Sequence, residues 1–367
     1  MHFMSSVLEP LSIVFSADAD FSVPFGIALH SLLSHAVPGR KFDIHVLDGG
    51  VREDVKKIVD TWRDTCHFTI KYHDLRNMFL SCGGGSGHFT AAMYYRFLIP
   101  DLLPESVHRA LYVDSDVMFM QDCGELFEQD LEGRCLGAVE DIYLAGLGDD
   151  VRHGRLVEDL GFPLDHAYYL SGQLLMDLDR MRAVDATRRL IWWAEEHSSR
   201  YRFPDQDVMN VVLEGDIQTI PCKWCVMPCF EREIQEGSFL KKLKYLSYTD
   251  SEITEAVKAP GLVHFAGGNK PDSTSPPATV LEAEFFRCRS ETPWTNEPPY
   301  TPEYIKVASH LLGGTPEQVK RRITSMMRIL RAVYRLPGAP TGYRMAIQTG
   351  IRLLSKAKRV RRQWGLS

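Results

Sequence analysis

The strongest indication of a functional site in this sequence is a pair of aspartates within one apolar run. Asp114 and Asp116 lie two residues apart within 111–119, LYVDSDVMF. Side chains at i and i+2 of an extended strand project from the same face, and two buried like charges are costly unless a cation lies between them. Carboxylate oxygens suit Mg²⁺ or Mn²⁺, ions that proteins often share with substrate phosphates. The pair therefore predicts a divalent metal site. Taken alone, a turn-capping aspartate beside a solvated one explains it equally well.

Short apolar runs alternate with amphipathic stretches, and this alternation predicts the elements that position the carboxylates. We expect strands at 12–16, 42–47, 68–72, 110–120 and 170–176, and helices at 25–34 and 54–64. Such an order favours parallel pairing in a Rossmann-like, doubly wound α/β sheet. Ligands bind at the carboxyl ends of strands in these sheets, so the site is expected at 17–21 and 114–116.

A haloacid-dehalogenase-type phosphatase is the alternative chemistry, because its catalytic loop is also an apolar strand that runs into DxD. That motif usually follows the first strand, whereas this one lies beyond residue 110. No downstream lysine with an acidic pair stands out either. The pattern favours a metal and phosphate site over the phosphatase.

Further motifs accompany the aspartate pair and recur in a fixed order. They are SIVFSADADF at 12–21, YYR at 94–96, LYVDSDV at 111–117, YLSGQLLMDLD at 169–179, PDQDVMN at 204–210 and VHFAGGNKP at 263–271. In order and approximate spacing they resemble the retaining glycosyltransferases of family 8, such as bacterial lipopolysaccharide and lipooligosaccharide galactosyl- and glucosyltransferases and, more distantly, glycogenin. The resemblance covers about 11–272.

The resemblance implies a GT-A fold, a UDP-hexose donor and a hydroxyl acceptor on a glycan or glycolipid. It implies Mn²⁺ as the cofactor, with Mg²⁺ as the alternative. Asp114 and Asp116 match the DxD ligands and His264 the third ligand, and an imidazole beside two carboxylates suits Mn²⁺ better. The positions implied to face the donor sugar and carry catalysis are Asp205, Gln206 and Arg96. The implied substrate-binding residues are Ala17, Asp18, Asp20, Phe21, His88, Arg96, Asp114, Ser115, Ser171, Gly172, Asp205, Gln206, Gly267 and Lys270.

Within that set, the resemblance implies that Asp18 and Phe21 hold the uridine, with the aromatic ring stacked on uracil. The resemblance also implies that Lys270 and the backbone of Gly267 contact the diphosphate, and that His88 belongs to a lid segment after the glycine-rich loop at 80–87. Gln206 is a poor nucleophile, so retention favours a front-face mechanism over double displacement.

Two departures from the family pattern bear on specificity. Ser171 stands where relatives commonly carry asparagine, which affects the sugar contacts, and Asp272 stands where a tryptophan usually packs near the acceptor. The cysteines of CKWCVMPC at 222–229 have CxxC spacing suggestive of a metal or cluster, but no fourth ligand lies nearby in sequence. The resemblance treats them as structural.

The charge of the chain is divided between two regions. Residues 318–367 contain 13 Lys and Arg and no Asp or Glu, whereas residues 1–317 carry the other 29 against 48 acidic residues, a net charge of −19. We expect a glycosyltransferase domain at 1–272, a proline-rich connection at 273–317 and a basic amphipathic helical tail at 318–367. The tail is expected to bind an anionic membrane surface, packing on the acidic body being the alternative. Nucleic acid is disfavoured because aromatic interleaving is missing.

The compartment follows from what the N-terminal sequence and the cysteines suggest. The first residues show no basic region followed by an apolar stretch and a cleavage site, so we expect a cytoplasmic protein, peripheral at the inner membrane face. Its eight cysteines are then expected to be thiols. A non-catalytic nucleotide-sugar or membrane-binding module is the alternative from a different functional class.

Overall fold

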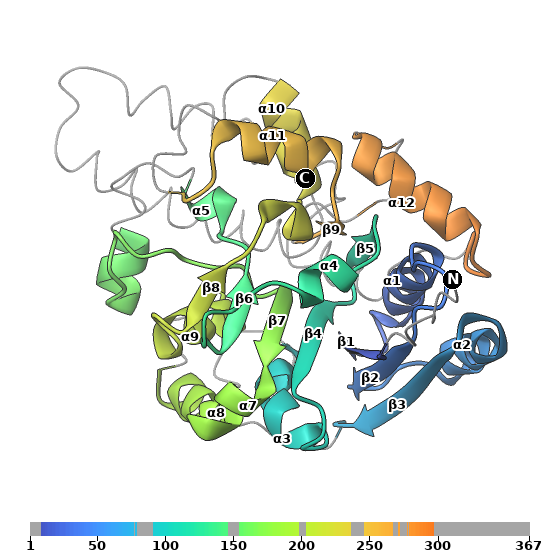
Figure 1. Ribbon diagram of the computed structural model, residues 1–367, viewed down its shortest axis with the longest axis horizontal. Coiled ribbons are helices and arrows are strands. Elements are labelled where there is room, and N and C mark those ends of the chain that lie inside the picture. Colours follow the sequence, from blue (N-terminus) through green and yellow to red (C-terminus); the bar gives the residue numbers. More distant parts are fainter. Residues whose placement is uncertain are drawn as a thin grey trace, which may run out of the picture.

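A seven-stranded mixed sheet forms the centre of the protein (Figure 1). The computed structural model describes residues 9–76, 78, 91–145, 154–197, 203–235, 246–266, 271, 277 and 279–296. Within them the strand order is β3-β2-β1-β4-β7-β6-β8. The strands are β1 (Leu11–Ala17), β2 (Phe42–Asp48), β3 (Phe68–Asp74), β4 (Arg109–Asp114), β6 (Leu136–Ala138), β7 (Gln173–Asp177) and β8 (Ile217–Thr219).

The pairing is parallel over the N-terminal half of the sheet and mixed beyond it. β1 pairs in parallel with β2 and β4, and β2 with β3. β7 runs antiparallel to both β4 and β6, while β6 and β8 are parallel. The predicted α/β sheet is confirmed, but it is not parallel throughout, because an apolar run gives no information about the direction in which its strand is paired.

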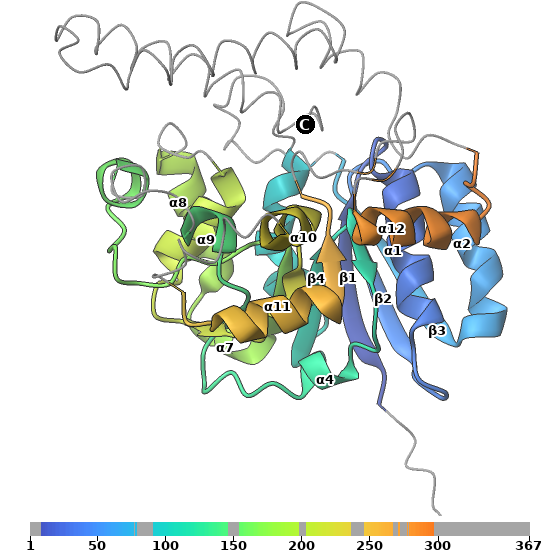
Figure 2. The same cartoon turned by 90° about the horizontal axis from the view of Figure 1, so that it is seen from above.

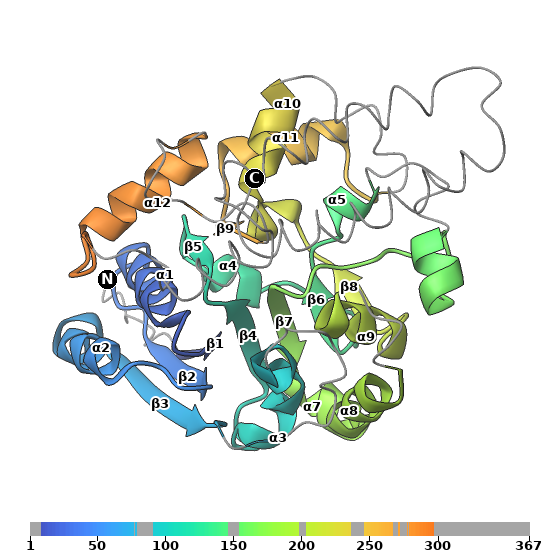
Figure 3. The same ribbon diagram turned by 180° about the vertical axis from the view of Figure 1, so that it is seen from behind.

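The apolar run that contains the two aspartates is not a single strand. β4 ends at Asp114, a turn follows at Ser115 and Asp116, and β5 (Val117–Phe119) starts a second sheet with β9 (Leu262–His264) (Figure 3). The prediction of one strand over 110–120 is therefore wrong at this turn. The two carboxylates meet because the chain bends, not because they share a strand face.

Apolar side chains on the two faces of the sheet pack into two clusters. In β1, Ile13 and Phe15 pack with α1 (Ser22–Ser34) and α2 (Glu53–Cys66), whereas Val14 faces η1 (Ala91–Leu98) and α8 (Ala186–His197). Burial on both faces explains the nearly continuous apolar strands. The other helices are α3 (Ile99–Leu102), α4 (Gly124–Phe127), α5 (Ile142–Ala145), η2 (Gly154–Glu158), α7 (Leu178–Ala183), α9 (Pro204–Val212), η4 (Cys222–Cys225), α10 (Pro228–Gln235) and α11 (Asp250–Lys258).

A further helix, α12 (Val280–Ser290), lies beside α1, within the segment expected to be a proline-rich connection (Figure 2). Glu231 accepts hydrogen bonds from the first two N–H groups of α12, at 3.0 and 3.2 Å. After the helix, Trp294 fills a notch over Gly26, where a Cβ would lie 2.3 Å from the indole. Residues 297–367, which include the basic tail, lie outside the described part of the chain.

In the described part of the chain, every helix is too short or too polar to cross a membrane.

Candidate active site

The turn after β4 brings the two predicted aspartates to the same point as His264. One ligand atom from each of Asp114, Asp116 and His264 lies within 4.8 Å of the others. Nε2 of His264 is 3.3 Å from Oδ1 of Asp116 and 3.6 Å from Oδ2 of Asp114. Ser115 pins the turn to β1 by donating its hydroxyl to the carbonyl of Ser16, at 2.6 Å. The predicted ligand set is thus assembled from residues 150 positions apart.

The electrostatics of this group favour a cation. Asp116 and His264 are 8% and 5% exposed, so water screens their charges little. Burial opposes protonation of the imidazole, but the adjacent Asp116 outweighs it and raises the pKa of His264 well above its ordinary value. Two carboxylate oxygens and one imidazole nitrogen are a donor set that fits Mn²⁺. These three residues would hold the metal.

A buried arginine links the metal-site strand to the first turn of α9. Arg96 donates from Nη2 to Oδ1 of Asp114 at 2.9 Å and from Nη1 to the carbonyl of Ser171 at 2.6 Å, and the same Nη1 lies 3.0 Å from Oδ2 of Asp205. The guanidinium also lies over the ring of Tyr112, 4.6 Å from its centre. Burial works against the charge, but Asp114 and Asp205 outweigh it and raise the pKa of Arg96. The arginine thereby fixes two carboxylates at set positions.

The predicted sugar-facing residues Asp205 and Gln206 start α9 and clasp the loop before β7. Ser171 donates its hydroxyl to Oδ2 of Asp205 at 2.7 Å and its backbone N–H to Oε1 of Gln206 at 3.2 Å. The amide of Gln206 in turn donates to Asp141 at 3.0 Å. Burial raises the pKa of Asp205, although Arg96 acts in the opposite direction.

Gly172 completes the contact between this loop and the metal ligands. Its carbonyl accepts the backbone N–H of Asp114 at 2.9 Å. A Cβ at Gly172 would lie 2.1 Å from Cε1 of His264, so the imidazole packs directly on the glycine backbone.

The residues predicted to hold uridine lie at the end of β1 and the start of α1. Ser16 is in register with Asp114, so the ends of β1 and β4 are neighbours. Oδ1 of Asp18 accepts the backbone N–H groups of Asp20 and Phe21, both at 3.1 Å, and burial raises the pKa of Asp18. Ala17 is buried, while Phe21 is half-buried. These side chains lie on the same edge of the sheet as the metal ligands.

Three predicted residues, His88, Gly267 and Lys270, lie outside the described part of the chain, as does the glycine-rich loop.

Sequence reasoning also missed contributors to the site. Tyr112 donates its hydroxyl to Oδ1 of Asp114 at 2.6 Å, and its place two residues before the DxD was an available signal. Nothing in the sequence around Asp141 indicated its contact with Gln206.

Within the described chain, Cys222 and Cys225 are free thiols, and Cys225 lies against His264.

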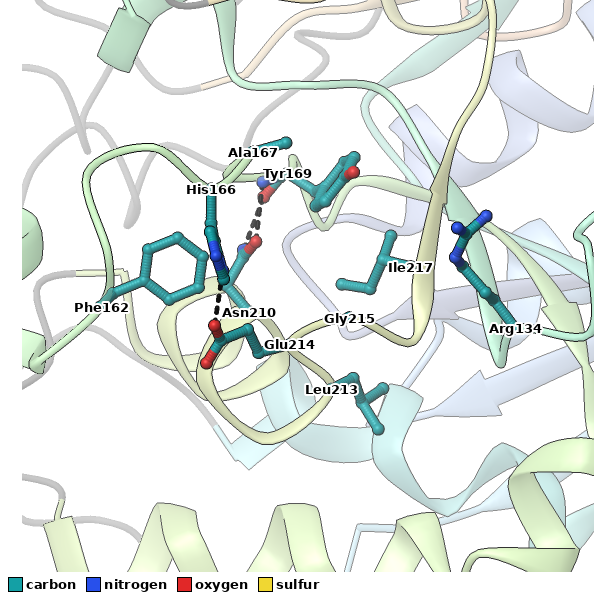
Figure 4. Close-up of a pocket in the computed structure, with 10 residues that line it drawn as sticks. All are labelled: Arg134, Phe162, His166, Ala167, Tyr169, Asn210, Leu213, Glu214, Gly215 and Ile217. Atoms are coloured by element: carbon teal, nitrogen blue, oxygen red, sulfur yellow. Dashed lines mark hydrogen bonds and ion pairs between the residues drawn. The ribbon is translucent and has the colours of Figure 1, made fainter.

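A separate pocket of about 260 Å³ lies at the C-terminal end of α9 (Figure 4). Asn210 forms part of its wall and hydrogen-bonds the backbone of Tyr169, which is also in the wall. The predicted site residues are not in its lining, which is Arg134, Phe162, His166, Ala167, Tyr169, Asn210, Leu213, Glu214, Gly215 and Ile217.

Next to Gln206, a buried ion pair anchors α9 to the segment around η2. Asp207 is fully buried and is contacted by the guanidinium of Arg155 and the hydroxyl of Tyr168. It also accepts the backbone N–H of Phe203 at 2.9 Å. This pair holds the helix that presents Asp205.

Replacing Arg155 by methionine should lower the free energy of unfolding by about 3–5 kcal/mol, because Asp207 is left buried without its charge partner. Urea unfolding measures the change. Arg188→Met is the matched control, since Arg188 pairs with Asp185 but its side chain is 80% exposed; it should change stability by less than about 0.5 kcal/mol. Equal effects of the two substitutions would contradict the anchoring role.

The overall arrangement is similar to that of solved glycosyltransferases. The galactosyltransferase LgtC, solved in complex with donor and acceptor sugar analogues, superposes with a TM-score of 0.63 at 20% identity, over 78% of this chain and 98% of that one. This likeness shows that the protein has the GT-A fold, with the carboxylate–histidine group at the carboxyl ends of the central strands.

The sequence comparisons identify the family. The model of glycosyl transferase family 8 matches residues 12–273, and the chain belongs to this family. General stress protein A of Bacillus subtilis is 28% identical over 289 residues, which are 78% of this chain and 95% of the relative. Lipopolysaccharide 1,2-glucosyltransferase of Escherichia coli is 24% identical over 313 residues, 83% and 86% of the two chains. The resemblance is confirmed, and the phosphatase alternative is set aside.

Proposed function

We propose that this family 8 glycosyltransferase is a Mn²⁺-dependent, retaining enzyme that transfers glucose or galactose from UDP to a hydroxyl of a glycan or lipopolysaccharide-type acceptor. The observation that carries the proposal is the group formed by half-buried Asp114 and buried Asp116 and His264, beside the Arg96–Asp205 pair. The similarity to a lipopolysaccharide 1,2-glucosyltransferase and to the galactosyltransferase LgtC supports a hexose donor and a glycan acceptor.

In this proposal, the chain supplies three functions around the donor. Asp18 and Phe21 bind uridine at the end of β1, and Asp205 and Gln206 contact the hexose from α9. The metal, when bound by its three ligands, acts as a Lewis acid on the diphosphate leaving group. Arg96 keeps the carboxylates of Asp114 and Asp205 in place while the substrate binds.

The acceptor hydroxyl attacks the donor sugar on the same face from which the diphosphate leaving group departs. Gln206 is neutral and already donates to Asp141, so it is poorly suited to form a covalent glycosyl intermediate. A departing phosphate oxygen accepts the proton of the acceptor hydroxyl in this front-face mechanism. Lys270 and the backbone of Gly267 contact the diphosphate, and His88 closes over UDP.

UDP release from a panel of UDP-sugars tests the proposal. We expect release from UDP-glucose or UDP-galactose with Mn²⁺, weaker release with Mg²⁺, and none with a chelator. UDP binding without release from any donor, with lipopolysaccharide-type acceptors present, would instead support a non-catalytic nucleotide-sugar-binding protein. Release that is unchanged by chelation would overturn the metal dependence.

The basic tail is proposed to hold the enzyme at an anionic membrane surface on the cytoplasmic side. Each Lys or Arg near such a surface contributes about 1 kcal/mol, and residues 318–367 contain 13 of them. Deleting residues 342–367 should therefore release the protein from vesicles that contain anionic lipid, as measured by co-sedimentation. Zwitterionic vesicles are the control. The deletion removes seven of the 13 cations, so undiminished binding of the truncated chain to anionic vesicles would exclude residues 342–367 as the anchor.

A further inference from the structure

Both the backbone and the imidazole ring of His264 are fixed by contacts with neighbouring segments. His264 ends β9 and is paired with Val117 of β5, and its backbone N–H donates to the carbonyl of Val226 at 2.8 Å. One edge of the ring, at Cε1 and Nδ1, packs on the backbone of Gly172. The ring orientation therefore depends on few remaining contacts, chiefly those of its two nitrogen atoms.

The two ring nitrogens have different neighbours. Nε2 is directed at the carboxylates of Asp114 and Asp116. Nδ1 lies 3.7 Å from Sγ of Cys225, a side chain with no exposed surface. The thiol therefore contacts the ring at the nitrogen that does not face the metal ligands.

The cysteine and the histidine are held by the same backbone pairing. Cys225 ends η4, and the next residue, Val226, donates its N–H to the carbonyl of Leu262 at 3.0 Å. Within η4, the carbonyl of Lys223 accepts the N–H of Gly261 at 2.8 Å. These bonds join η4 to β9, so the sulfur and the imidazole keep their relative positions.

The chemistry of metal binding explains what the contact between Cys225 and His264 can do. A neutral imidazole that offers the lone pair of Nε2 to a metal carries its proton on Nδ1, and that proton needs an acceptor. Histidine ligands usually donate this proton to a carboxylate, a backbone carbonyl or water, which fixes the tautomer and the ring orientation. At His264 the atom in that place is a thiol sulfur, a weak but polarisable acceptor.

We propose that Cys225 is a positioning residue of the metal site, whose sulfur accepts the Nδ1 proton of His264 and keeps Nε2 directed at the metal. The inference rests on the metal binding contained in the proposed function. The thiol acts through the imidazole ring and is not itself a metal ligand. The candidate ligand atoms that lie within 4.8 Å of one another are those of Asp114, Asp116 and His264.

Binding of Mn²⁺ alone, followed by electron paramagnetic resonance of the free ion, tests the role without measuring activity. Cys225→Ala should weaken Mn²⁺ binding about tenfold, the lower end of the effect of losing such a partner, because sulfur is a weak acceptor. Cys222→Ala is the matched control: Cys222 is a buried thiol of the same turn, but its sulfur contacts the carbonyl of Glu252 at 3.6 Å. Its Mn²⁺ affinity should equal that of the wild type.

Cys225→Asn separates hydrogen bonding from packing, because asparagine has a similar volume and a carbonyl oxygen that accepts the Nδ1 proton. We expect it to restore or exceed wild-type Mn²⁺ affinity. Equal affinity of Cys225→Ala and the wild type, or equal losses in Cys225→Ala and Cys222→Ala, would overturn the positioning role while leaving the proposed function intact. A wild-type protein that does not bind Mn²⁺ would overturn both.

Discussion

Substituting Asp116 by alanine should lower kcat/KM for sugar transfer by about 1,000-fold or more, equivalent to about 4 kcal/mol of transition-state stabilisation. Asp116 supplies one of the two negative charges of the proposed metal site and is the carboxylate nearest to Nε2 of His264. Without it, Mn²⁺ affinity falls, and the charge that develops on the diphosphate is poorly compensated. UDP release at several Mn²⁺ concentrations measures both effects.

The matched variants for this prediction separate charge from shape. Asp116→Asn keeps the size of the side chain and removes the charge, so it should be nearly as inactive as Asp116→Ala. Asp101→Ala removes an exposed carboxylate from α3 and should leave turnover unchanged. Cooperative unfolding of each variant establishes that it is folded. Wild-type turnover of Asp116→Ala at limiting Mn²⁺ would falsify the metal assignment.

The sequence predicted the edge of the sheet where the site lies, because strand ends can be located from apolar runs. The end of β1 follows directly from the run at 12–16, and Asp18 comes just after it. β4 ends at Asp114, inside the run at 110–120, so here the aspartate pair rather than the end of the run indicated the site. Joining His264 to them required the family resemblance. Periodicity alone does not bring together residues 150 positions apart.

The features that the sequence did not reveal depend on partners distant in the chain. The break at Ser115 is invisible in an apolar run, since Val113 and Val117 are both buried; the break occurs because β5 pairs with β9 rather than continuing in the main sheet. The antiparallel direction of β7 has the same kind of cause. The thiol of Cys225 belonged to a CxxC pattern that suggested a different metal site, and its neighbour is a histidine 39 residues later.

Replacing Gly172 by alanine should lower Mn²⁺ affinity and kcat/KM by about 100-fold. The added Cβ would lie 2.1 Å from Cε1 and 2.5 Å from Nδ1 of His264, closer than two such atoms can approach. The backbone of Gly172 is not in the left-handed region, so the effect is steric. Either the imidazole or the loop must move, and the loop is tied to Asp114 through the 2.9 Å hydrogen bond to its N–H. The overpacking should also cost about 1–3 kcal/mol of stability.

Gly154→Ala is the control, because among the described residues its Cβ would meet the flexible carboxylate of Glu158 alone, at 3.4 Å. Its stability should change by less than about 0.5 kcal/mol. A double-mutant cycle then identifies the cause of the Gly172→Ala effect. If the alanine acts by displacing the imidazole, its stability cost should largely disappear in a His264→Ala background, because the ring that it strikes is absent. Additive losses in the two backgrounds would show that the damage arises elsewhere in the loop, since only residues in contact give large coupling energies.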